Sequence, residues 1–129
     1  MSARSYMLST VLIGLVAALH FYFLVVEMFL WETPKVRKGF GLDAEFAKKS
    51  KPLAMNQGLY NGFLAAGLVW ALVHPDGAVS FQLKVFFLVC VLVAGIFGAI
   101  TANRKIFFVQ ALPAALALMS LCFRCSSAS

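Results

Sequence analysis

The sequence predicts an all-α fold, an antiparallel bundle of four transmembrane helices in a single domain covering residues 1–129. Composition is the first reason, because 62% of the residues are hydrophobic and only 12% are charged, whereas soluble domains have roughly 45–50% apolar and 25% charged residues. The second reason is the presence of four apolar stretches, each long enough to cross a hydrocarbon core of roughly 30 Å as a helix. They cover residues 10–31, 53–73, 85–102 and 106–123. This composition excludes a disordered tail and a typical water-soluble enzyme.

The first stretch is predicted to be a retained helix and not a cleaved signal peptide. Its apolar part exceeds the usual 7–15 residues of a signal peptide, and no small-residue cleavage site follows it. It ends instead in Phe29, Leu30 and Trp31. Tryptophan is enriched where membrane meets water, so Trp31 is predicted to anchor the helix at that boundary.

The connection from residue 32 to residue 52 is the longest polar segment. Pro34, Gly39 and Gly41 are expected to break any continuous helix there. A short interfacial helix is expected over residues 43–49, capped by Asp43; a plain solvated loop is the alternative. Residues 74–77, with the sequence HPDG, predict a compact turn between the second and third helices.

The positive charges predict the orientation of the chain. The connections after the first and third helices lie on one side of a four-helix bundle and hold eight Lys and Arg residues, against three on the opposite side. Such residues concentrate in cytoplasmic loops. The sequence therefore predicts a multi-pass protein of the inner membrane with both termini extracytoplasmic, and it explains the net charge of +6 without a nucleic-acid partner. The eight are Lys35, Arg37, Lys38, Lys48, Lys49, Lys51, Arg104 and Lys105; the three are Arg4, Lys84 and Arg124.

Several polar residues fall inside the apolar stretches, at comparable depth in the cytoplasmic half of the predicted bundle. Polar and ionisable groups within a membrane face the protein interior and indicate function by default. We expect them to share one pocket that opens toward the cytoplasm, with His20 at its floor. The predicted catalytic residues are Glu27 and His20, and the predicted ligand-binding residues are Asn56, Gln57, Tyr60, Asn61 and Gln110.

Two functions remain open at this point. In the first, the pocket holds a small, largely apolar ligand, and Glu27 and His20 support acid/base chemistry or proton-coupled transport. In the second, the protein is a non-catalytic assembly factor or accessory subunit whose polar residues only fix helix packing. Whether the chain is an enzyme is left undecided.

Small residues recur every four positions in two of the predicted helices. Such faces let helix backbones approach closely in lipid. Gly58 and Gly62 in the second helix are therefore expected to pack against Ala94 and Gly98 in the third. The same faces could also join two copies of the chain.

The sequence predicts no cofactor and no metal site. His20 and His74 fall at a mid-membrane position and an outer turn, too far apart to share an ion easily. Cys122 and Cys125 form a C-x-x-C pair without a second pair of ligands. A disulfide between these two cysteines stays open.

Four sequence blocks carry a resemblance to a known family: HFYFLVVEMFLW, NQGLYNGFLAAGL, VAGIFGAIT with NRKI, and VQALPAALAL. They resemble the bacterial domain-of-unknown-function family 1304, small four-helix membrane proteins. The resemblance covers residues 15–118. It implies an integral membrane protein and supplies no activity.

Overall fold

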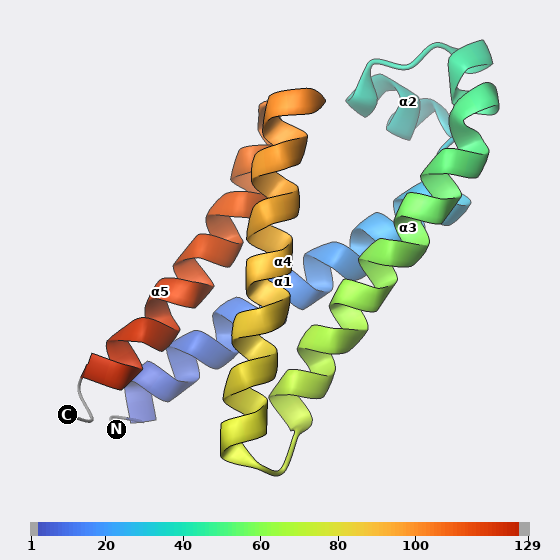
Figure 1. Cartoon of the computed structure of the whole chain (residues 1–129). Helices are drawn as coiled ribbons and strands as arrows, with labels where there is room; N and C mark the ends of the chain where they lie inside the picture. The colour runs from blue at the N-terminus through green and yellow to red at the C-terminus, as the bar shows by residue number, and fades with distance from the viewer. Residues whose placement is uncertain (1–2, 127–129) are drawn as a thin grey trace. The chain divides into compact units, whose positions relative to one another are not determined.

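The computed structural model describes residues 3–126, with side chains for residues 3–123. It consists of helices, which confirms the predicted all-α class (Figure 1). The elements in order are α1 (Ala3–Phe29), α2 (Pro34–Phe40), α3 (Ala44–Val73), α4 (Gly77–Thr101), the π-helix η1 (Phe107–Ala111) and α5 (Leu112–Ser126).

The short helix after α1 exists, but its predicted position was wrong. It is α2, which is delimited by Pro34 and Gly41, two of the three residues expected to break a helix, and which includes the third, Gly39. Pro34 is its first residue, where a fixed φ and a missing N–H do no harm. Gly41 ends it in the left-handed conformation, with φ of 67°, which glycine adopts without steric cost.

Residues 43–49 do not form a separate helix, because they are the beginning of α3. Asp43 caps that helix as expected: its Oδ1 accepts the backbone N–H of Phe46 at 2.8 Å. Pro52 lies inside α3 and does not start it. The second predicted helix is therefore extended by more than two turns toward the connection.

The chain divides into two compact units, and the prediction of a single domain stays a prediction. Residues 18–65 form one unit, which we call the α2 unit. Met1–Ala17 and Ala66–Ser129 form the other, which we call the α4–α5 unit. Both α1 and α3 contribute to each unit.

Close helix packing organises the α4–α5 unit, where α4 and α5 lie side by side (Figure 1). A Cβ placed on Gly95 would lie 2.5 Å from the backbone nitrogen of Ala111. Such an approach is available only to glycine. The side-chain hydroxyl of Ser80 donates to the carbonyl of Ala71 at 2.6 Å, which joins the end of α3 to the start of α4.

In the α2 unit, two glycines of α3 lie in close contact with α1. A Cβ on Gly58 would lie 2.8 Å from Cγ of Met28, and a Cβ on Gly62 would overlap Leu24. Gly98 meets Ile106, beyond the end of α4. Periodicity thus marks a close-packing face but does not identify its partner, which for Gly58 and Gly62 is α1. The expected contact of these glycines with Ala94 and Gly98 would join the two units and stays a prediction.

The fourth predicted helix begins with the π-helical turn η1, which the sequence analysis did not anticipate. The backbone N–H of Leu112 donates to the carbonyl of Phe107, one residue further back than in an α-helix. Pro113 follows directly. In a regular α-helix its ring would clash with the carbonyl four residues earlier, and the wider turn relieves this contact.

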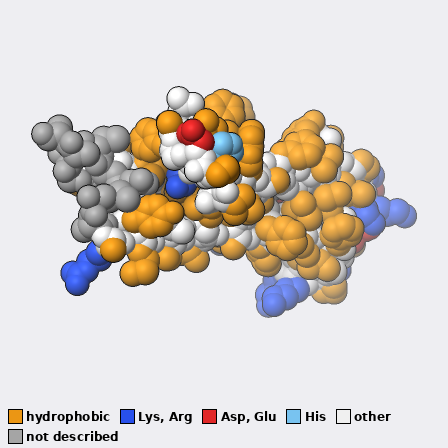
Figure 2. Space-filling view, turned by 90° about the horizontal axis from the view of Figure 1, so that it is seen from below, with side chains coloured by type: hydrophobic (Ala, Val, Ile, Leu, Met, Phe, Trp, Pro, Cys, Tyr) orange, Lys and Arg blue, Asp and Glu red, His pale blue; other side chains and the backbone are white. Residues whose placement is uncertain are grey.

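Two helices are long and apolar enough to cross a membrane, namely α1 and α4. The apolar helix over Phe107–Phe123 is shorter. Hydrophobic side chains cover most of the face shown in Figure 2, with few charged groups among them. Many large apolar side chains are strongly exposed, including Phe29, Leu53, Phe97, Ile100 and Phe123.

A first prediction concerns the packing of α4 against α5. Gly95→Ala should lower the free energy of unfolding in detergent by about 1–3 kcal/mol, because the new methyl group meets backbone atoms of Ala111 that cannot move aside. Gly14→Ala is the control, since its Cβ would meet nothing within 4 Å. Equal unfolding temperatures for the two variants would contradict the packing described here.

A second prediction concerns the start of α4. Asp76 Oδ1 accepts the backbone N–H of Val79 at 2.9 Å, and this bond holds the pKa of Asp76 below its usual range. A carboxylate whose pKa is lower in the folded state than in the unfolded state stabilises the fold at pH values above the unfolded-state pKa. This stabilisation is lost as the pH falls through the folded-state pKa. Asp76→Ala should therefore lower the unfolding temperature near neutral pH more than in acid.

Asp76→Asn is the matched control, because asparagine also caps a helix but does not titrate. Thermal unfolding across an acid-to-neutral pH series measures both variants. A destabilisation by Asp76→Ala that is independent of pH would show that the capping carboxylate is not the titrating group.

Candidate functional site

The carboxylate of Glu27 is the centre of the candidate site. Glu27 lies in the last turns of α1 and is only 6% exposed. Its Oε1 accepts an N–H from the side-chain amide of Gln57 at 3.2 Å, and its Oε2 accepts one from the amide of Asn61 at 3.0 Å. Gln57 and Asn61 are four residues apart on α3, so they share one helix face. The structure thus brings together three of the residues that the sequence singled out.

Gly58 makes this arrangement possible. A Cβ at this position would lie 3.0 Å from Cβ of Glu27 and 3.2 Å from the carbonyl oxygen of Leu24. Any side chain would push α3 away from α1 and lengthen both amide–carboxylate hydrogen bonds. Gly58 was expected to pack against the third predicted helix, so its role at the site was not predicted from the sequence. Its position between Gln57 and Asn61 was the available signal.

The geometry gives Glu27 a defined chemistry. Each carboxylate oxygen receives one N–H, and each amide carries a carbonyl oxygen at its other end. When the carboxylate takes up a proton, an amide that rotates can accept the new O–H instead of donating. The cluster can therefore accommodate Glu27 with or without its charge, and an ionised Glu27 can attract a cationic group.

His20 is fully buried on the same helix as Glu27. Seven residues separate them, which is about 10 Å along the axis of α1 at 1.5 Å per residue. The imidazole ring lies edge-on to Phe23, with 5.6 Å between ring centroids. His20 thus lies two helical turns from the carboxylate, on nearly the same face of the helix.

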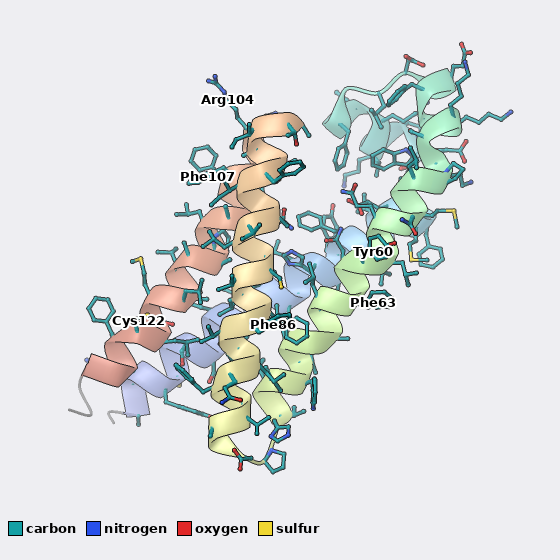
Figure 3. The ribbon with its side chains drawn as sticks, viewed as in Figure 1. Tyr60, Phe63, Phe86, Arg104, Phe107 and Cys122 are labelled. Carbon is teal, nitrogen blue, oxygen red and sulfur yellow. The ribbon has the colours of Figure 1, made fainter. Side chains whose placement is uncertain are left out.

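The remaining predicted residues lie elsewhere. Asn56 and Tyr60 are exposed on α3, and the Tyr60 ring is 6.1 Å from that of Phe63 (Figure 3). Gln110 belongs to the α4–α5 unit, so its place beside Glu27 stays a prediction. The catalytic and ligand-binding roles of all seven residues also remain predictions.

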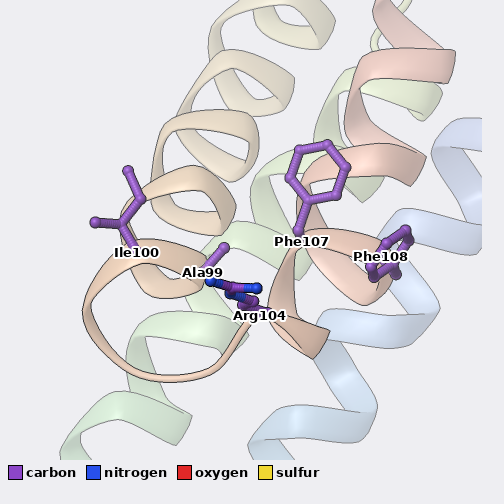
Figure 4. Close-up of a pocket in the computed structure, with 5 residues that line it drawn as sticks. All are labelled: Ala99, Ile100, Arg104, Phe107 and Phe108. Carbon is purple, nitrogen blue, oxygen red and sulfur yellow. The ribbon is translucent and has the colours of Figure 1, made fainter.

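A hollow of about 490 Å³ lies in the α4–α5 unit. Its lining residues lie on both sides of the turn between α4 and η1 (Figure 4), and it was not predicted from the sequence. Arg104 is its one charged lining residue, and the rest of the lining is apolar: Ala99, Ile100, Phe107 and Phe108.

The described part of the chain holds no cluster of three His, Cys, Asp or Glu side chains that could bind a metal ion. The side chain of Cys125 lies outside the described residues, so its pairing with Cys122 stays untested.

Comparison with known proteins places this architecture in a family. The chain is 30% identical over 119 residues to the uncharacterized protein YpaA of Lactococcus lactis subsp. lactis (strain IL1403), covering 88% of this chain and 97% of that protein. No solved structure is similar enough to count as a match. Residues 14–122 match the model of the family described as a protein of unknown function, DUF1304. The chain therefore belongs to the DUF1304 family.

Proposed function

We propose that this chain is an integral membrane protein that crosses the inner membrane four times, with both termini outside the cytoplasm. Two crossings are α1 and α4, which have the required length and apolar character. The second part of α3 and the helix over Phe107–Phe123 supply the other two. In α3, the amide side chains of Asn56, Gln57 and Asn61 lower the mean hydropathy of a helix that is otherwise apolar in its second part.

The distribution of side chains in the α2 unit supports this placement. Its buried residues include His20, Glu27 and Asn61, while Phe21, Phe63 and other aromatic residues are more than half exposed. Water-soluble proteins show the reverse arrangement, because burial of large apolar side chains stabilises their fold. A polar interior and an apolar exterior are expected where the surrounding solvent is lipid.

We further propose that Glu27 exchanges a proton in step with the binding of a small, largely apolar compound that carries a positive charge. The observation that carries this proposal is the Glu27 carboxylate, nearly buried on an apolar helix and held by the amides of Gln57 and Asn61. A carboxylate in a membrane helix is costly, and its retention favours a functional role. His20 then serves as a second proton-handling group, and the amides of Gln57 and Asn61 orient the compound beside the carboxylate.

The alternative is a non-catalytic assembly or accessory protein. The two amide–carboxylate hydrogen bonds favour it, because a carboxylate that is satisfied by neighbouring helices can serve packing alone. The two functions differ in one measurable respect. Only the first requires that Glu27 gain or lose a proton when a ligand binds.

A third prediction separates these functions. Tetraphenylphosphonium, an apolar cation, is added to the purified protein in a weakly buffered detergent solution, and a pH-indicator dye records proton release. Binding beside Glu27 should release a proton, because the cation stabilises the ionised carboxylate. Triphenylphosphine oxide, which is similarly apolar but neutral, should release none. Glu27→Gln should abolish the release.

Glu45→Gln is the matched control. Glu45 pairs with Lys49 at 2.6 Å on the surface of α3, and its side chain is 76% exposed. This variant should release protons as the parent does. Asn61→Leu tests the site a second time without altering the titrating group, and it should weaken cation binding. Equal release from the parent and Glu27→Gln, both folded by circular dichroism, would contradict the proposal and favour the packing role.

A further inference from the structure

Three interactions join the end of α1, helix α2 and the start of α3. The Trp31 ring lies 5.2 Å from the Phe40 ring, and its indole N–H donates to the hydroxyl of Ser50 at 3.0 Å. The ammonium group of Lys51 contacts the Glu32 carboxylate at 2.5 Å. We call residues 31–51, held together in this way, the α2 platform. The platform lies wholly within the α2 unit, so its geometry can be described by itself.

The platform is strongly basic, and its acidic residues are already engaged. Residues 31–51 hold six Lys and Arg against three Asp and Glu. Glu32 pairs with Lys51, and this hydrogen bond lowers the pKa of Glu32. Glu45 pairs with Lys49, and Asp43 caps α3. Among the residues that the structure describes, the three cations of α2 form no ion pair: Lys35, Arg37 and Lys38.

Arg37 carries a second, independent sign of a missing partner. Its Nε atom is buried and has no hydrogen-bond acceptor among residues 3–123. Its backbone carbonyl accepts the N–H of Leu42 at 2.8 Å, so the backbone carbonyl is satisfied while Nε is not. A buried N–H without an acceptor is destabilising. The planar guanidinium group is suited to phosphate, which it binds with two parallel N–H donors.

The platform and the turn of α3 that follows it also expose apolar side chains. Phe40 is 51% exposed, Phe46 54% and Leu53 75%. Aromatic and aliphatic groups of this kind enter the boundary between headgroups and acyl chains, while basic groups next to a membrane helix attract anionic lipids. The platform follows α1 directly, and α1 is long and apolar enough to cross the membrane.

We propose that the α2 platform binds anionic phospholipid, with Arg37 and Lys38 holding the headgroup phosphate and Phe40 and Phe46 contacting its acyl chains. The inference depends on the membrane placement proposed above, but not on the proton chemistry of Glu27. Anionic phospholipid is the partner that satisfies both features of the platform, its unpaired basic groups and its exposed apolar side chains.

The test measures which lipid stays with the protein. The purified protein is equilibrated with an equimolar mixture of phosphatidylglycerol and phosphatidylcholine in detergent and separated by gel filtration, and mass spectrometry measures the retained ratio. The parent should be enriched in phosphatidylglycerol. The double variant Arg37→Gln with Lys38→Gln should reduce this enrichment by about fivefold for each cation removed. This is the effect expected when each basic residue near an anionic surface contributes roughly 1 kcal/mol to binding.

Arg104→Gln with Lys105→Gln is the matched control. It removes the same charge from the connection after α4, which lies outside the platform, and the enrichment should persist. Trp31 reports the fold of each platform variant when Trp70→Phe leaves it as the only tryptophan. Its emission should remain that of the parent.

Two outcomes would overturn the proposal. One is an equal loss of enrichment in both double variants, which would mean that total charge alone attracts the lipid. The other is a retained lipid ratio in the parent that equals the supplied ratio. Glu27→Gln should keep the enrichment of the parent even if the proton chemistry proposed for Glu27 is wrong, so the two proposals fail separately.

Discussion

A carboxylate on an apolar helix needs hydrogen-bond donors, and the α2 unit is built around meeting that requirement at Glu27. The donors come from α3, where Gln57 and Asn61 lie one turn apart and each reaches one carboxylate oxygen. Gly58 lets the two helices come close enough for those bonds to form. Gln57, Gly58 and Asn61 on α3 are therefore all explained by the carboxylate on α1.

The same requirement explains why the α2 unit has so little apolar core. Apart from Val26, its buried apolar residues are small, chiefly Ala47, Ala54 and Ala65. Hydrogen bonds and close backbone contact hold α1 and α3 together there, as expected when lipid removes the hydrophobic drive for helix association. In the α4–α5 unit, small residues allow the helices to pack closely: Gly95 on α4, and the buried alanines Ala111, Ala114 and Ala117 on η1 and α5.

Much of this could be predicted from the sequence. Composition and the length of the apolar runs predicted the helical class, and the four-residue spacing of Gln57 and Asn61 predicted a shared face. Family membership was also evident from the residues themselves. The errors concern partners and boundaries. Pro34 and Gly41 interrupt a continuous helix as expected, but they also delimit the short helix α2, which was predicted over residues 43–49 instead.

The glycine pattern likewise did not identify α1 as the neighbour of Gly58 and Gly62. A repeat of small residues is a property of one helix, whereas packing depends on which other helix comes near, and only the three-dimensional structure supplies that. The π-helical turn before Pro113 and the hollow lined by Arg104 depend on a backbone adjustment that composition does not reveal. The orphaned Nε of Arg37 likewise becomes visible only when its surroundings are known.

The coupling between Glu27 and Asn61 is the most direct test of this account, and a double-mutant cycle measures it. Unfolding free energies in detergent are compared for Glu27→Leu, Asn61→Leu and the double variant. The account predicts a coupling of about 0.5–3 kcal/mol, because either single change leaves a nearly buried polar partner unsatisfied. Glu27→Leu combined with Tyr60→Leu should be additive, since Tyr60 is 55% exposed. Additivity of Glu27→Leu and Asn61→Leu would contradict the central role of this hydrogen-bonded carboxylate.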